Sequence, residues 1–428
     1  MATTPYLLSI FLLSLSLADA NIKTSRGVTL QLVHRFSPSL SFHKSDNFEN
    51  FLERNDEYVI KRIAMFQQES IDAQLITPTS RHEHLFFVNL SIGEPPVIQY
   101  LAMDTGSRLI WVIGDSLKRE FKYSPRSSST SSFVSCGSDI CKKISNSRCN
   151  SSICTCLTRY GDGHELESYM LYDRFLFENA TVDKVIMGVH YRGSGGLFGE
   201  DNFYGVFGLG PRYPSIVHRL HDLGANKFSY YINGKVTDNF HPYAGLTLGD
   251  ADVQGGSTTP LLIDDAQYLI SLETISLGEE CLPIDPKVFA KIENVGGTGV
   301  VIDSGSVKTW VAETAYHKVD SRISDALDKR GFDRRDKYCY FGTIEEVQKS
   351  NFPILSFNFA GGADLHLDED DLFMDYPLLN YFCLTVRSSA VLGPTFENLT
   401  IIGLTAQQDY VMGYDLENLR LSMKLSDL

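Results

Sequence analysis

Two short segments of the sequence carry the same pattern of polar residues directly after an apolar run. They are Asp104-Thr105-Gly106-Ser107 and Asp303-Ser304-Gly305-Ser306. One such tetrapeptide alone is typical of a β-turn in which Asp accepts backbone hydrogen bonds. The repeat extends further, because Val206-Phe207-Gly208 and Ile401-Ile402-Gly403 follow the two aspartates by 104 and 100 residues respectively. Several landmarks at nearly equal spacing predict two duplicated lobes.

The chemistry available to these residues is that of a carboxylate pair. If a pseudo-two-fold axis relates the lobes, the two turns meet at it and Asp104 faces Asp303. Two carboxylates in contact cannot both ionise at low cost, so the pair shares one proton over an acidic range. One can act as general base on a bound water while the other protonates a carbonyl, with no metal or cofactor. Glycosidases also use two carboxylates, but at separations that exclude a shared proton.

The neighbours of the two aspartates have expected supporting roles. The hydroxyls of Thr105 and Ser304 can hydrogen-bond across the axis and fix the pair. Glycines let the backbone turn closely beneath the carboxylates, and serine hydroxyls can orient the outer carboxylate oxygens; these residues are Gly106, Gly305, Ser107 and Ser306.

Strands are expected to position both turns. Apolar runs are short and are broken by Gly, Pro, Asn, Asp or Ser, which favours an all-β chain over long amphipathic helices. The expected strands cover 85–93, 97–103, 169–177, 184–189, 245–248 and 267–277, and the best helix candidates are 215–223 and 313–330. Ser124 to Ser135 and the cysteine-rich segment behind it are expected to form an irregular surface region.

Bulk composition narrows the class of protein. The chain has 428 residues, 43% hydrophobic and 21% charged, which is ordinary for a globular protein, and its length argues for two lobes. The net charge of -15 repels a phosphate backbone, so no nucleic-acid partner is expected. A monomer is the default expectation.

The N-terminal part is expected to be processed. Tyr6 to Leu17 is apolar but short for a bilayer span, and Ala18-Asp19-Ala20 suits signal cleavage, so 1–20 reads as a signal peptide. The alternative is a buried strand or an anchor; no membrane contact is expected once the signal is removed. Residues 21–80 are polar, helix-like over 47–68 and without strand alternation, which indicates a pro-segment or else a plain N-terminal subdomain. The expected lobes are then 81–240 and 241–428.

Cysteines and sequons are consistent with secretion. The eight cysteines are Cys136, Cys141, Cys149, Cys154, Cys156, Cys281, Cys339 and Cys383. An even count in a secreted chain predicts disulfides but leaves 105 pairings open. A zinc site is disfavoured, because the five clustered cysteines include no paired C-x-x-C and no His at ligand spacing. Four N-glycosylation sequons begin at Asn89, Asn150, Asn179 and Asn398.

These motifs closely resemble the pepsin-like aspartic proteases, in particular the plant branch that includes the nepenthesins. Trp111 stands where the family's Trp supports the flap, a hairpin that closes over substrate. Tyr160-Gly161-Asp162-Gly163 resembles that flap, with Tyr160 as its tyrosine. Further matching segments are 27–35, which resembles the group's pro-segment, together with 89–96, 205–210, 228–230, 361–365, 382–384 and 401–416.

The resemblance implies a bilobal fold and an aspartic endopeptidase made as a zymogen. It also implies polypeptide substrates, no cofactor, and a location in the extracellular space (the apoplast) or in a vacuole. The alternative is an inactive binding or inhibitor protein, since one fold serves several functions and the family contains inactive members. Both Asp-hydroxyl-Gly-Ser turns and Tyr160 are present, which favours the enzyme.

Several residues depart from the family pattern. His164-Glu165-Leu166-Glu167-Ser168 follows the flap in place of the usual Ser and Gly. Arg108 and Lys308 are cations close to the two turns, and both are expected to face solvent. Cysteines common after Trp111 are absent. Cys156 and Cys281 are unusual and could pair with each other, whereas Cys339 with Cys383 resembles the family's C-terminal bridge.

Overall fold

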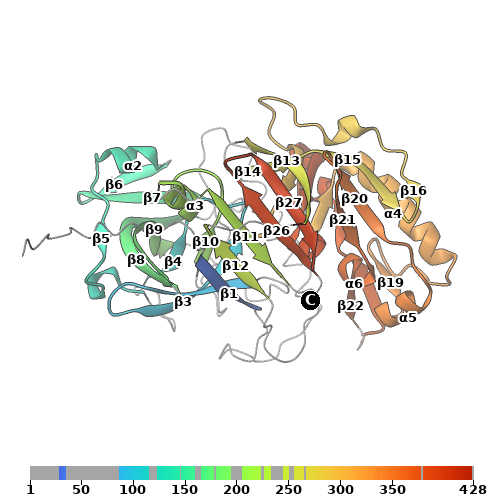
Figure 1. The fold of residues 1–428 in the computed structure, drawn as a ribbon, viewed down its shortest axis with the longest axis horizontal. Coiled ribbons are helices and arrows are strands. Elements are labelled where there is room, and N and C mark those ends of the chain that lie inside the picture. Colours follow the sequence, from blue (N-terminus) through green and yellow to red (C-terminus); the bar gives the residue numbers. More distant parts are fainter. Residues whose placement is uncertain are drawn as a thin grey trace, which may run out of the picture.

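The computed structural model describes residues 28–34, 86–114, 123–144, 146–159, 165–177, 180–193, 205–222, 226–232, 244–249, 255–264, 267–376 and 379–426. Two lobes lie side by side, and a sheet of strands from both ends of the chain runs between them (Figure 1). Strands dominate the described residues in both lobes, which confirms the all-β prediction. Among the described residues, no helix is long and apolar enough to cross a membrane.

The N-terminal lobe is built around two hairpins. Its strands are β2 (Phe86–Ile92), β3 (Val97–Asp104), β4 (Trp111–Ile113), β5 (Ser132–Phe133), β6 (Ser147–Asn150), β7 (Ile153–Arg159), β8 (Glu165–Phe177), β9 (Ala180–Gly193) and β10 (Gly205–Gly208). The helices are η2 (Pro125–Ser127), α2 (Asp139–Lys143) and α3 (Ile216–Asp222). From residue 172 to residue 177, β8 alternates between half-buried and buried side chains, as expected of a strand with one face on a core.

The C-terminal lobe has more helix. Its strands are β14 (Gln267–Ile270), β15 (Leu272–Leu277), β16 (Glu280–Cys281), β17 (Thr298–Ile302), β18 (Thr309–Val311), β19 (Cys339–Phe341), β20 (Leu355–Phe359), β21 (Ala363–Leu367), β22 (Phe373–Tyr376), β23 (Tyr381–Leu384), β24 (Val386–Ser388) and β25 (Asn398–Ile402). The helices are η4 (Pro286–Phe289), α4 (Glu313–Asp328), α5 (Ile344–Lys349), α6 (Glu369–Leu372), η6 (Ser389–Leu392), η7 (Pro394–Phe396) and η8 (Leu404–Gln407). Along α4, Tyr316, Val319, Ile323 and Leu327 are buried, at the spacing of one helix face.

Six strands form the central sheet in the order β1-β12-β11-β26-β27-β13, where β1 is Val28–His34, β12 is Gly245–Leu248, β11 is Lys227–Tyr231, β26 is Tyr410–Asp415, β27 is Arg420–Leu425 and β13 is Ser257–Asp264. The first strand lies within the expected pro-segment, where no strand was predicted. β1 pairs with β12 through residues 28–31 and with β2 through residues 32–34. Its Val, Leu and Thr residues suit a strand, although the surrounding polar sequence hides the pattern.

The two halves repeat one strand arrangement. β10 runs parallel to β3, with Gly208 opposite Asp104, and β25 runs parallel to β17, with Ile402 opposite Ile302. β17 lies between β14 and β25 in the sheet, and all five of its residues are buried. Strands covered on both faces read as continuous apolar runs, which explains the sequence before the second Asp-hydroxyl-Gly-Ser turn.

Three disulfides lie within the lobes. Cys136 bonds to Cys149, Cys141 to Cys154, and Cys339 to Cys383. The last pair confirms the bridge implied by the family resemblance. The suggested pairing of Cys156 with Cys281 is wrong, because neither is disulfide-bonded: Cys156 is buried in β7 of one lobe and Cys281 is exposed on β16 of the other. The other two disulfides connect the short β6–β7 hairpin to α2 and to the segment just before it.

Candidate active site

The two Asp-hydroxyl-Gly-Ser turns come together at the junction of the lobes. Asp104 is the last residue of β3 and Asp303 directly follows β17, and their exposed fractions are 1% and 0%. The backbone N–H of Thr105 donates to Ser304 Oγ at 3.0 Å, and the N–H of Ser304 donates to Thr105 Oγ1 at 2.9 Å. This reciprocal pair joins residues 199 apart in sequence and is the contact across the axis that the sequence predicted. We call it the crossed pair.

Each carboxylate is also held by its own turn. The N–H of Gly106 donates to Asp104 Oδ1 at 2.8 Å, and the N–H of Gly305 donates to Asp303 Oδ1 at 2.9 Å. Such bonds fix the carboxylate plane relative to the turn.

The two serines of the turns behave differently. Ser107 Oγ donates to Asp104 Oδ2, as expected from the sequence. Ser306 Oγ instead donates to the carbonyl of Lys308 at 3.1 Å, so the predicted contact of this serine with Asp303 is replaced. The hydroxyl has one hydrogen, and the carbonyl two residues ahead is the acceptor that takes it. The two halves of the pair therefore have unequal hydrogen-bond environments.

Two glycines allow the strands behind the turns to approach closely. A Cβ on Gly208 would lie 2.8 Å from the carbonyl oxygens of Ser107 and Leu109, and a Cβ on Gly403 would lie 2.1 Å from the carbonyl oxygen of Lys308. Both are shorter than the contacts that a Cβ tolerates. The repeated glycine about one hundred residues after each Asp is thus required by backbone packing under the turn.

A chain of buried polar contacts connects the two turns through the central sheet. Tyr230 donates its hydroxyl hydrogen to Gln407 Oε1, so its oxygen accepts from the Tyr414 hydroxyl at 3.1 Å. The Thr105 side chain is a polar neighbour of the Tyr414 hydroxyl and offsets part of the rise that burial causes in the Tyr414 pKa. Gln407 Nε2 donates to the carbonyl of Ile402 at 2.9 Å.

The far end of this chain reaches the second turn. The carbonyl of Ile402 also accepts the N–H of Asp303 at 3.0 Å. Thr105, Tyr230, Tyr414 and Gln407 have exposed fractions of 0% or 1%, so every link is shielded from water. We call Thr105, Tyr414, Tyr230 and Gln407 the buried relay. Sequence reasoning missed it, since four polar residues on three separate elements share no spacing.

Aromatic packing holds the relay in place. Phe228 stacks on Tyr414 at a ring-centroid distance of 4.3 Å, and Tyr268 meets Tyr414 edge-on at 4.9 Å. The hydroxyl of Tyr268 donates to the carbonyl of Leu209 at 2.8 Å, directly behind the first turn. Burial raises the pKa of Tyr230 and Tyr268 well above 10, so both phenols stay protonated hydrogen-bond donors at any pH of interest.

Each lobe also places a tryptophan at the same offset from its aspartate. Trp111 on β4 and Trp310 on β18 are fully buried. The Trp111 ring lies 4.3 Å from the ring of His190, whose Nδ1 is hydrogen-bonded to Ser168 Oγ. Complete burial lowers the pKa of His190 to about 3, so the imidazole is neutral at mildly acidic pH. This cluster sits where β8 follows the expected flap.

The expected flap, Tyr160-Gly161-Asp162-Gly163 with His164, lies outside the described residues, as do the predicted signal peptide and the helix-like segment 47–68. The rest of the unusual stretch is the start of β8 and pairs with β7, Glu167 lying opposite Leu157. Glu167 accepts a hydrogen bond from the Tyr191 hydroxyl at 2.8 Å. The charged residues thus extend a regular hairpin.

The expectation that Arg108 and Lys308 face solvent is wrong. Arg108 is 9% exposed and Lys308 is 1% exposed. The backbone of Arg108 packs closely against Gly208, and the backbone of Lys308 packs closely against Gly403. Both residues therefore leave the turns in the interior of the protein.

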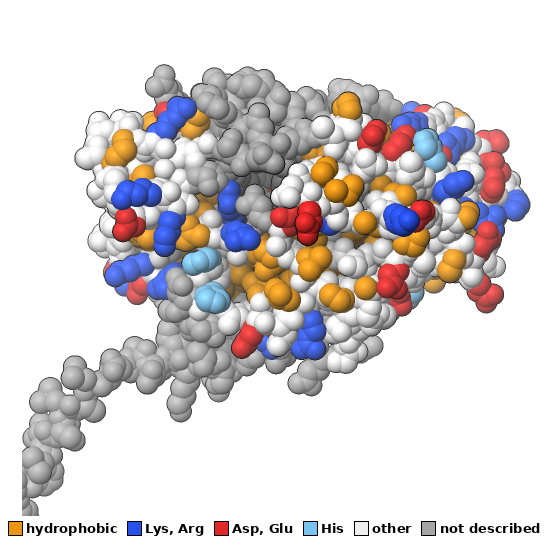
Figure 2. Space-filling model, turned by 90° about the horizontal axis from the view of Figure 1, so that it is seen from above, with side chains coloured by type: hydrophobic (Ala, Val, Ile, Leu, Met, Phe, Trp, Pro, Cys, Tyr) orange, Lys and Arg blue, Asp and Glu red, His pale blue; other side chains and the backbone are white. Residues whose placement is uncertain are grey.

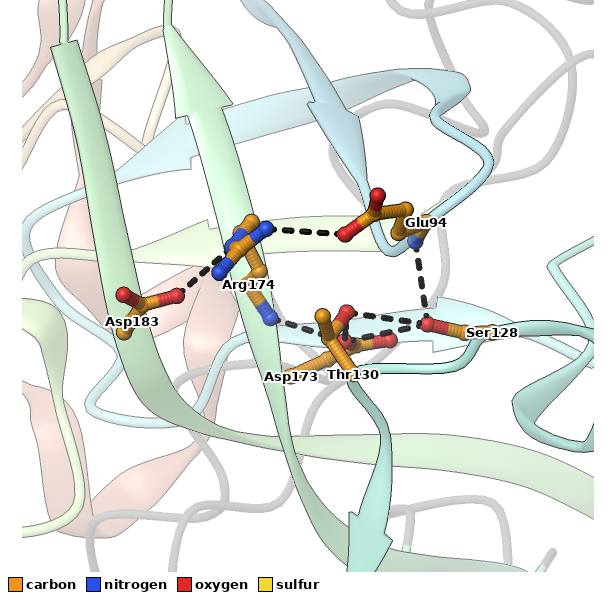
Figure 3. Close-up of polar contacts among 6 residues, drawn as sticks. All are labelled: Glu94, Ser128, Thr130, Asp173, Arg174 and Asp183. Carbon is orange, nitrogen blue, oxygen red and sulfur yellow. Dashed lines mark hydrogen bonds and ion pairs between the residues drawn. The ribbon is translucent and has the colours of Figure 1, made fainter.

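Another buried carboxylate, that of Asp173, anchors β8 (Figure 3). Asp173 accepts hydrogen bonds from the hydroxyls of Tyr123, Ser128 and Thr130 and from the N–H of Arg174. The serine-rich segment is therefore anchored at Ser128, although it was expected to be irregular surface. On the outer side, Arg174 pairs with carboxylates of the β2–β3 turn and of β9, namely Glu94 at 2.9 Å and Asp183 at 2.7 Å.

The four sequons fall in different settings. Asn150 and Asn398 are exposed, Asn89 is half-buried in β2, and Asn179 lies outside the described residues. Asn150 Nδ2 donates to the Tyr191 hydroxyl at 3.3 Å. The first two positions are open to modification as they stand.

Comparisons with known proteins agree with this geometry. The family models described as "Xylanase inhibitor N-terminal" and "Xylanase inhibitor C-terminal" match residues 86–250 and 267–424. Aspartic proteinase nepenthesin-1 of Nepenthes gracilis is 30% identical over 353 residues, covering 78% of this chain and 76% of that protein. Nepenthesin-2 of the same species is 27% identical, covering 89% and 85%.

Solved structures show the same fold. Conglutin gamma from lupine seeds superposes with a TM-score of 0.61 at 14% identity, covering 80% of this chain and 92% of that one. Soybean basic 7S globulin superposes with a TM-score of 0.57 at 17% identity, covering 82% and 95%. With the paired turns and the nepenthesin match, these findings show that the chain belongs to the pepsin-like aspartic proteases, in their plant nepenthesin-like branch.

Proposed function

We propose that this protein is a secreted aspartic endopeptidase that hydrolyses peptide bonds at acidic pH. The observation that carries the proposal is the crossed pair, which holds two buried carboxylates in matching turns at the junction of the lobes. Preorganised hydrogen bonds around Asp104 and Asp303 suit a site that must hold its geometry while a proton moves.

In this mechanism a water molecule lies between the carboxylates of Asp104 and Asp303. One carboxylate removes a proton from the water as it attacks the peptide carbonyl, and the other protonates the carbonyl oxygen. The tetrahedral intermediate then collapses with proton transfer to the leaving amine. The bonds from Gly106, Gly305 and Ser107 keep both carboxylates in the plane that this exchange needs.

Substitution of either aspartate tests the mechanism. Asp104→Asn and Asp303→Asn should each abolish cleavage of a mixed peptide library between about pH 2 and 7, the range over which such a pair titrates. Asp139→Asn, at a side chain 91% exposed on α2, is the matched control and should retain full activity. Residual cleavage in both active-site variants, with native circular dichroism, would contradict the assignment.

A binding or inhibitor protein on the same fold is the second candidate, because the matching family models are described as xylanase inhibitors. The two candidates separate in one experiment. The processed protein is assayed for peptide cleavage, for binding of a statine-type transition-state analogue and for inhibition of a xylanase. Cleavage blocked by the analogue establishes the peptidase, whereas xylanase inhibition without cleavage or analogue binding establishes the alternative.

We further propose that residues 1–20 direct secretion and that residues 21–80 are removed as a pro-segment. Extracellular delivery is supported by the three disulfides and the exposed sequons at Asn150 and Asn398. N-terminal sequencing of the protein recovered outside the cell should start near residue 81. A start near residue 21 in fully active protein would show that the segment is retained, and recovery only from vacuoles would change the compartment.

A further inference from the structure

A hollow on the N-terminal lobe shares no residue with the carboxylate site. It has a volume of about 580 Å³ and lies among β5, β8, β9 and α3. That size is within the usual range for small-molecule sites. Its described lining residues include Lys184, His218 and Arg219, and none of its described lining residues is Asp or Glu. In a chain of net charge -15, a hollow with three basic side chains and no acidic one is unusual.

The two strongest cations of the hollow have no counter-charge. Within the described part of the chain, no ion pair forms to Lys184 or to Arg219. The Nε atom of Arg219 is buried and has no hydrogen-bond acceptor there. A partly buried guanidinium without a counter-charge costs free energy, which an anion bound in the hollow would offset. Figure 2 shows Lys, Arg and His side chains gathered over the lobe at the left of the view.

Backbone geometry directs Lys184 into the hollow. The pairing of β8 with β9 shifts register between Asp173 and Phe175, so two residues of β9, Asp183 and Lys184, oppose one residue of β8. Lys184 has a φ of 57°, a conformation that a residue with a side chain adopts rarely. Such bulges re-aim a side chain and recur at functional sites. Asp183 turns to Arg174 while Lys184 lines the hollow.

The remaining walls offer rings and hydroxyls. Tyr172 and Tyr213 both line the hollow, and the ring of His218 meets that of Tyr213 edge-on at 5.4 Å. Ser132 on β5 is exposed, and Ser215 lies at the start of α3. Flat aromatic faces, hydroxyls and cations together match the C–H face, hydroxyl groups and carboxylate of an acidic sugar.

An acidic peptide fits this hollow less well. At Tyr172 the strand β8 is paired on both sides, with β5 through Ser132 and with β9 through Ile186. No open strand edge is therefore present at that point to hydrogen-bond an extended peptide backbone. Recognition must come from side chains, which suits a small rigid ligand.

We propose that this hollow binds a sugar acid, a monosaccharide-sized ring carrying a carboxylate, with Arg219 and Lys184 as the carboxylate ligands. The site shares no described residue with the carboxylate pair and is independent of peptide hydrolysis. It would let the protein attach to acidic polysaccharide while the carboxylate site stays available.

Calorimetric titration of the full secreted protein tests the proposal, with D-glucuronate, D-glucose and inorganic phosphate as probes. Glucuronate should bind saturably and at least about tenfold more tightly than either glucose or phosphate. Equal binding of glucose would overturn the role of the cations. Equal binding of phosphate would overturn the role of the sugar. The Asp104→Asn variant should bind glucuronate as the wild type does, which separates this site from the peptidase site.

Three charge-removing variants locate the site. Arg219→Gln should weaken glucuronate binding about tenfold or more, and Lys184→Gln should weaken it several-fold. Arg126→Gln, an exposed cation of the same lobe outside the hollow, is the matched control and should leave the affinity unchanged. Lys184 is exposed, so its variant keeps the test valid if Arg219→Gln fails to fold. Equal effects of Lys184→Gln and Arg126→Gln would overturn the proposal.

Discussion

The buried relay should set how firmly the carboxylate pair is held, and Tyr414→Phe is the sharpest perturbation of it. The substitution removes one hydroxyl and no ring volume. It leaves the buried Tyr230 oxygen without its donor and removes the polar neighbour of the buried Thr105 hydroxyl. Loss of one partner for a buried polar group costs about 1–3 kcal/mol, so we expect a loss of about 1–3 kcal/mol in the free energy of unfolding.

Thr105→Val should cost more, because it breaks the crossed pair as well as the relay. The N–H of Ser304 loses its acceptor, and the Tyr414 hydroxyl loses its polar neighbour. We expect a loss of about 2–4 kcal/mol. Since both variants disrupt one shared contact, the double variant should cost about 1 kcal/mol less than the sum of the single ones. Displacement of the carboxylates should also lower kcat by about 10- to 100-fold in either variant.

The measurements are urea unfolding and peptidase kinetics at acidic pH. Unfolding can be followed in both lobes, because the chain has two tryptophans, Trp111 in one lobe and Trp310 in the other. Tyr410→Phe is the matched control: the Tyr410 oxygen accepts from the His366 N–H at 3.0 Å, away from the relay. If Tyr414→Phe lowers kcat no more than Tyr410→Phe, or if the double variant is additive, the relay does not position the pair.

Three further outcomes follow from packing and burial. Gly403→Ala should destabilise the protein by more than about 3 kcal/mol or prevent folding, measured by urea unfolding, since its Cβ would lie 2.1 Å from the Lys308 carbonyl; a loss below 1 kcal/mol would show that the turn can move. Asp173→Ala should cost about 3–5 kcal/mol, measured in the same way, because its buried donors lose their shared acceptor; near-neutral unfolding would contradict this. His190 has a pKa of about 3 when folded against 6.5 ordinarily, so the unfolded chain alone takes up its proton between these pH values. Above pH 6.5 the His190 ring is neutral in both the folded and the unfolded chain, so its burial costs no stability through protonation. As pH falls toward 3, up to about 5 kcal/mol of the free energy of unfolding is lost. His190→Gln should flatten that decline, and parallel stability curves for the two proteins would refute it.

The repeat in the sequence was sufficient to predict the carboxylate pair, its position at strand ends and the crossed pair. These features follow from a short local pattern that occurs twice in the sequence, namely an apolar strand followed by Asp, a hydroxyl residue and Gly. Helices α3 and α4 were placed to within two residues for the same reason, because their apolar spacing is local. The Cys339–Cys383 bridge came from the family resemblance and is confirmed.

Features that depend on distant packing could not be predicted. Arg108 and Lys308 are charged, so the sequence alone predicts that they lie on the surface. Both are buried, because the strand behind each turn packs closely against the backbone at these positions. Cys156 and Cys281 were expected to pair because both are unusual for the family, but they lie in different lobes. The relay joins residues that are close only after both lobes have met. No periodic spacing in the sequence identifies the residues of the relay.

The central sheet has a consequence for the order in which the molecule assembles. Its middle contact, β11 with β26, joins a strand from the middle of the chain to one near the C-terminal end, and Tyr230 and Tyr414 are 184 residues apart. The crossed pair spans 199 residues. Closing such long loops is slow compared with forming hairpins such as β8–β9. Each lobe can therefore build its hairpins and bury its tryptophan before the two aspartates meet, so we expect the carboxylate pair to form late in folding.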